Sequence, residues 1–113
     1  MEKLQNEIDS FIANRNWQKF HSPKNLAMAL TVETAELLEI FQWMTPEESS
    51  QPTSEILSHI EEEIGDVMIY LTTIATSFGL DPMDAAHKKL RLNEKKYPAE
   101  KSVVSPGKNT QPL

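Results

Sequence analysis

Two pairs of acidic residues lie inside the most apolar segments of this chain: Glu33 and Glu36 in one, Glu63 and Asp66 in the other. Residues three apart on a helix point in nearly the same direction, and here that direction is also the apolar one. Four carboxylates that face a core repel one another and lose their hydration, at a cost of several kcal/mol per ion. Neither segment offers a buried Lys or Arg to compensate. A divalent cation is therefore the expected partner.

Hydrophobic periodicity and capping residues predict an all-α fold. We expect helices over residues 2–14, 23–43, 54–78 and 81–98, with one short turn beginning at Thr45. The third helix is apolar on nearly all sides, which is typical of a helix buried centrally. In a chain of 113 residues, this pattern indicates that a partner subunit covers part of that helix.

Length and charge restrict the class of protein. The chain fits one domain, which we expect over residues 1–98, followed by a flexible tail over 99–113. A formal net charge of −6 disfavours binding to nucleic acid, and no apolar run reaches the ~20 residues that span a bilayer. The sequence contains no cysteine and no visible secretory signal. We therefore expect a cytoplasmic protein that binds neither nucleic acid nor membrane.

Spacing selects the metal ligands of the third helix. Asp66 lies one turn after Glu63, whereas the residue at the same distance from Glu62 is Gly65. If the second and third helices pack antiparallel, the Glu63–Asp66 pair faces the earlier pair across the seam. Ligands that offer only oxygen favour Mg²⁺ or Mn²⁺. The alternative is that these carboxylates form a solvated face and bind no metal.

An acidic magnesium site has a phosphate chain as its expected ligand, because Mg²⁺ is usually held by carboxylates together with substrate phosphates. Three polar residues of the fourth predicted helix share one face and can contact phosphate oxygens: Lys89, Asn93 and Lys96. Three aromatic residues can stack on a nucleobase: Trp17, Trp43 and Tyr70. The alternatives are solvent exposure for the polar residues and core packing for the aromatic ones.

The chain resembles the MazG-like family of all-α nucleoside triphosphate pyrophosphohydrolases, in its short, single-domain branch. The resemblance runs from about residue 8 to Pro98 and includes both acidic pairs. It also includes these segments: Asn14-Arg15-Asn16-Trp17, Phe20-His21-x-Pro23-Lys24-Asn25-Leu26, Glu39-Ile40-Phe41-Gln42-Trp43, Asp66-Val67-Met68-Ile69-Tyr70-Leu71 and Asn93-x-Lys95-Lys96-Tyr97-Pro98. His59 has no role assigned by the resemblance.

The resemblance implies a Mg²⁺-dependent conversion of a (d)NTP to (d)NMP and pyrophosphate, a house-cleaning activity with dCTP-like preference. It implies four metal ligands: Glu33, Glu36, Glu63 and Asp66. It places Lys89 and Asn93 at the phosphates, and Trp17, Trp43 and Tyr70 around the base. It also implies a four-helix bundle completed by homo-oligomerisation, with a tetramer (dimer of dimers) favoured over a dimer. We expect in-line attack of water on the α-phosphorus, with Glu33 or Glu36 accepting the water proton.

Two other functions compete with this hypothesis. A di-iron carboxylate bundle requires two Glu-x-x-His motifs, and only Asp84-x-x-His87 comes near that pattern. A non-enzymatic helical interaction or regulatory module with a structural metal is the second alternative. That module would release no pyrophosphate from any dNTP.

Overall fold

The computed structural model describes residues 2–99 of the chain. The expected tail therefore lies, apart from residue 99, outside the described residues, and the proposed domain boundary at residue 98 stays a prediction. The helices are α1 (Glu2–Asn14), the 3₁₀ helix η1 (Gln18–Phe20), α2 (Pro23–Phe41), α3 (Pro46–Ser49), α4 (Ser54–Ser77) and α5 (Pro82–Lys96). Residues 2–99 contain no strand, so the predicted all-α class is confirmed.

Side-chain caps fix where four of the helices begin. The Ser22 hydroxyl accepts from the backbone N–H of Asn25 at the start of α2, and Thr53 caps α4 in the same way. Thr45 takes part in a full capping box at α3, and the Asp81 carboxylate accepts two N–H groups of α5. Each such cap stabilises its helix by about 1 kcal/mol. The starts of these helices are thus determined by local sequence.

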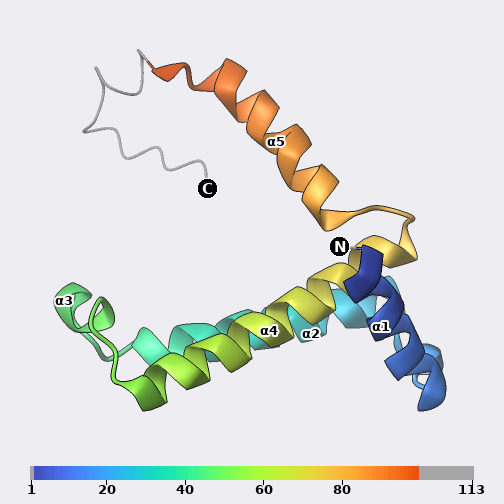
Figure 1. The fold of residues 1–113 in the computed structure, drawn as a ribbon, viewed down its shortest axis with the longest axis horizontal. Helices are drawn as coiled ribbons and strands as arrows, with labels where there is room; N and C mark the ends of the chain where they lie inside the picture. The colour runs from blue at the N-terminus through green and yellow to red at the C-terminus, as the bar shows by residue number, and fades with distance from the viewer. Residues whose placement is uncertain (1, 100–113) are drawn as a thin grey trace.

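Helices α2 and α4 pack side by side and antiparallel, and α1 crosses the C-terminal part of α4 (Figure 1). The short helix α3 lies at the other end of the pair. The buried core sits where the first three long helices meet, and its members are Ile8, Ile12, Leu26 and Thr72. This arrangement leaves the middle of the α2–α4 seam free for polar side chains.

Helix α5 extends away from the α2–α4 pair (Figure 1). Gly79, with φ of 68°, forms part of the turn between α4 and α5. Leu90 and Leu92 of α5 are exposed, as are Met28 and Val32 of α2. The radius of gyration is 17.5 Å, compared with about 13 Å for a compact domain of 100 residues. One chain therefore does not close a four-helix bundle by itself.

The predicted completion of the bundle by a second copy remains a prediction, which the exposed apolar side chains support. Helix α4, expected to be covered partly by a partner, exposes Leu57, Ile64 and Ile69. Within the described part of the chain, no helix combines the length and apolarity needed to cross a bilayer.

Candidate metal centre

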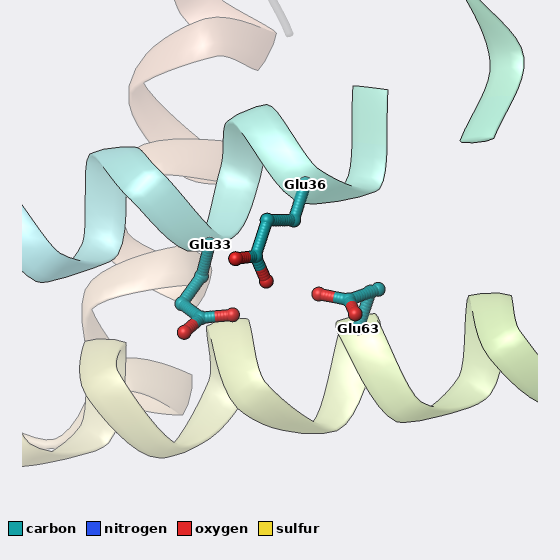
Figure 2. A group of neighbouring side chains, drawn as sticks. All are labelled: Glu33, Glu36 and Glu63. Atoms are coloured by element: carbon teal, nitrogen blue, oxygen red, sulfur yellow. The ribbon is translucent and has the colours of Figure 1, made fainter. Parts of the chain in front are cut away.

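Three of the four predicted ligands converge between α2 and α4. Glu33 and Glu36 project from α2, and Glu63 projects toward them from α4 (Figure 2). Each residue contributes a carboxylate oxygen, and these oxygens all lie within 4.8 Å of one another. The antiparallel packing of the two helices brings together side chains that are about 30 residues apart in the sequence. Such a group can hold one cation between two helices.

Burial agrees with the predicted register. Glu63 is buried, with 8% of its surface exposed, while Glu61 and Glu62 are exposed. Glu33 is half-buried and Glu36 is exposed, so the group opens toward solvent on the α2 side. The acidic residue of α4 that faces the seam is therefore Glu63, as the spacing to Asp66 indicated.

Burial and mutual repulsion raise the pKa values in this group. Desolvation raises the pKa of Glu33 from 4.5 to about 7, and Glu36 adds to the increase by hydrogen bonding and by charge. Desolvation and Glu36 likewise raise the pKa of Glu63. Asp66 lies outside the group of three, but its charge raises both pKa values. The fourth predicted ligand is thus close enough to belong to the same electrostatic cluster.

The unpartnered atoms of the cluster fit a hard divalent cation. Oε2 of Glu33 and Oε2 of Glu63 are buried and have no hydrogen-bond donor in the described part of the chain. A buried polar atom without a partner costs about 1–3 kcal/mol. Carboxylate oxygens from two helices are ligands that Mg²⁺ and Mn²⁺ prefer. A cation bound here would satisfy both oxygens and offset the repulsion among the carboxylates.

His59 is the basic side chain that touches this cluster within residues 2–99. Its Nε2 lies 3.4 Å from Oε1 of Glu63, one helical turn further along α4. The charge of a protonated imidazole opposes the other influences and lowers the pKa of Glu63. His59 lies four residues before Glu63 on the same helix, and the family resemblance assigned it no role.

A cavity of about 390 Å³ lies between α1 and α4, next to the carboxylate cluster. Asp66 lines it, together with two of the three aromatic residues predicted at the base, Trp17 and Tyr70. Phe11 meets Trp17 edge to face, with ring centroids 5.6 Å apart. The aromatic walls and the acidic cluster are therefore neighbours, with Asp66 between them.

Sequence reasoning missed three polar residues of this cavity, Glu7, His21 and Thr73, of which the first two are titratable. Glu7 interrupts the apolar face of α1 between Leu4 and Phe11, which is the same signal that identified Glu33. His21 has a buried Nδ1 without a partner. No comparable signal marked His21, because it lies in the connector after η1, where no periodicity applies.

Within one chain, the remaining predicted site residues lie away from the carboxylate cluster. Trp43 is 88% exposed, in the link between α2 and α3, at the end of the pair opposite α1 (Figure 1). Lys89, Asn93 and Lys96 lie on α5, which extends away from the pair. Their roles at base and phosphates stay predictions.

Comparison with known proteins places these features in a family context. The model of the MazG-like family matches residues 28–105. The chain is 34% identical to dCTP pyrophosphatase 1 of Homo sapiens, over 98% of this chain and 66% of that protein. Identity to dCTP pyrophosphatase 1 of Mus musculus is 35%, over 97% and 66%. The chain thus spans slightly less than two thirds of the length of these relatives.

A solved structure is similar over almost its whole length. It is the crystal structure of a pyrophosphatase from Archaeoglobus fulgidus, which shares 41% sequence identity with this chain and superposes with a TM-score of 0.75. The match covers 87% of this chain and 92% of the archaeal one. At this identity and coverage, the two chains share a fold.

Proposed function

The chain belongs to the MazG-like family, and from this membership we propose that it hydrolyses nucleoside triphosphates to the monophosphate and pyrophosphate with Mg²⁺ or Mn²⁺. The observation that carries the proposal is the convergence of Glu33, Glu36 and Glu63. The names of the relatives, dCTP pyrophosphatase 1 and a pyrophosphatase, support the reaction class. They also support a deoxynucleotide such as dCTP as the preferred substrate.

The ion would be held by Glu33, Glu36 and Glu63, with Asp66 as the fourth ligand. When bound, it supplies positive charge that neutralises phosphate oxygens during displacement at phosphorus. Glu33 and Glu36 are the candidates for accepting the proton of the attacking water.

The cavity beside Asp66 is the proposed site for the nucleobase. Trp17 and Tyr70 line it and offer aromatic faces for stacking. Glu7 and His21 offer polar atoms that can distinguish one base edge from another, and Nδ1 of His21 has no partner among residues 2–99. With the base in this cavity, the triphosphate would extend past Asp66 toward the carboxylate cluster.

We propose a homo-oligomer, a tetramer in preference to a dimer, as the active form. Helix α5 carries Lys89, Asn93 and Lys96 away from the carboxylates of its own chain. Leu90 and Leu92 on the same helix are exposed, although burying apolar surface would stabilise the fold. A second copy would cover these leucines and close the bundle.

Product analysis tests the reaction. Metal-free protein is incubated with each of the four dNTPs and four NTPs, with and without Mg²⁺, and the products are separated by anion-exchange chromatography. We expect dCMP and pyrophosphate in equal amounts from dCTP, and no dCDP. Release of orthophosphate with dCDP would indicate cleavage at the γ-phosphorus and contradict the proposal. Absence of pyrophosphate from all eight nucleotides would favour a non-enzymatic interaction module.

The donor set disfavours the di-iron alternative. The group that converges in the described residues consists of carboxylates alone, while Asp84 and His87 lie on α5. A di-iron bundle needs histidines that project inward beside the carboxylates. Iron analysis and visible absorbance of the purified protein check this point.

A further inference from the structure

His59 contacts the cluster at one oxygen only. Its Nε2 lies 3.4 Å from Oε1 of Glu63. The His59 side chain is 57% exposed, whereas the Glu63 side chain is 10% exposed. The contact therefore reaches from the solvent side of α4 to a side chain that is almost fully buried.

The two oxygens of Glu63 have different surroundings. Oε1 has the imidazole as a partner, while Oε2 is buried and has none. The other charged neighbours of Glu63 are the carboxylates of Glu33, Glu36 and Asp66, which repel it. Among the charged neighbours of Glu63 in residues 2–99, the imidazole is the one whose charge attracts this carboxylate.

We propose that His59 is a positioning residue, which holds Oε1 of Glu63 so that Oε2 faces the cation and thereby increases the affinity of the site for a divalent metal. The inference rests on the proposed function, because it assumes a metal in the cluster. Partners that orient a metal ligand typically raise metal affinity by about 10–100-fold.

Binding of Mn²⁺ to the metal-free protein tests the inference without any turnover. Isothermal titration calorimetry is run on the wild-type protein and on H59A, H59Q and H87A. H59Q keeps a side-chain N–H donor that can reach one turn along the helix. H87A is the matched control, because His87 is an exposed histidine of α5, a different helix. Far-UV circular dichroism verifies that each variant is folded.

We expect H59A to raise the Kd for Mn²⁺ by about 10-fold, H59Q to recover most of this loss, and H87A to bind like the wild type. In steady-state assays, H59A should raise the Mg²⁺ concentration needed for half-maximal rate and leave kcat at saturating Mg²⁺ nearly unchanged. A purely structural role would not produce this separation or the rescue by glutamine.

Each contrary result has a distinct meaning. If H59A binds Mn²⁺ as tightly as the wild type, the positioning role is wrong and the proposed function stands. If H59A and H59Q are weakened equally, the contact to Oε1 is not the cause, and the inference is also wrong. If the wild-type protein binds neither Mn²⁺ nor Mg²⁺, the metal site itself and the proposed function fail.

Discussion

The rings of Phe11 and Trp17 meet edge to face, with their centroids 5.6 Å apart and their planes at 74°. The Arg15 guanidinium lies over the Phe11 ring, 3.7 Å from its centre. Trp17 precedes η1 and is 42% exposed. Phe11 therefore packs against Trp17, and both side chains line the cavity.

Removing the Phe11 ring is expected to weaken substrate binding. Phe11→Ala should destabilise the fold by about 1 kcal/mol, the value of an aromatic pair, and should raise KM for dCTP several-fold with kcat nearly unchanged. Thermal unfolding and steady-state kinetics measure the two effects. Phe78→Ala is the control, because Phe78 is exposed and does not line the cavity. An unchanged KM in Phe11→Ala would argue against base binding beside Trp17.

Glu63→Gln should abolish turnover and at the same time stabilise the metal-free protein. The amide removes one of the mutually repelling charges and a metal ligand. Loss of a ligand should lower metal affinity by on the order of 100-fold or more. This effect is larger than that of losing a residue that only orients a ligand. Calorimetry with Mn²⁺, pyrophosphate release and thermal unfolding in EDTA measure these effects.

Glu62→Gln is the matched control for this variant. It makes the same chemical change at the adjacent residue of α4, which is exposed. We expect its turnover, metal affinity and melting temperature to equal those of the wild type. If the two variants lost turnover equally, the assignment of Glu63 as the seam-facing ligand would be wrong.

Local sequence predicted where the helices begin but not the direction of α5. The starts of α2, α3, α4 and α5 follow from caps whose partners lie within three residues. The second helix was predicted to Trp43 but ends at Phe41, because a turn must precede the cap at Thr45. The direction of α5 depends on the turn at Gly79, which hydrophobic periodicity does not encode.

The acidic cluster was predictable because spacing on a helix determines which side chains share a face. That rule selected Glu63 over Glu62, and the structure buries the former. It did not indicate that Asp66 would line the neighbouring cavity while Glu63 joins Glu33 and Glu36. The cavity itself depends on how α1 crosses α4, so Glu7 and His21 became visible only in three dimensions.

Placing a charge on α5 tests the oligomer. Leu92→Glu places a charge on a side chain that we expect a second copy to cover, so the assembly should dissociate and turnover should fall. His87→Glu, which introduces the same residue at an exposed position on another face of the same helix, should leave the mass unchanged. Light scattering coupled to gel filtration measures both variants. A wild-type mass equal to one chain would contradict the proposed oligomer.

The stability of the metal-free protein should depend on pH through Glu33. Its pKa in the folded state is about 7, above its ordinary value of 4.5, so folding favours the protonated form. The resulting stabilisation is fully present below pH 4.5 and is lost as the pH rises to about 7. Melting temperatures in EDTA should therefore fall over this range, and they should fall less in Glu33→Gln, which has no proton to lose. Because bound cations stabilise the native state by mass action, adding Mg²⁺ at pH 8 should raise the melting temperature of the wild type more than that of Glu33→Gln. Parallel pH curves for the two proteins would show that Glu33 keeps an ordinary pKa, and that repulsion within the cluster is relieved in some other way.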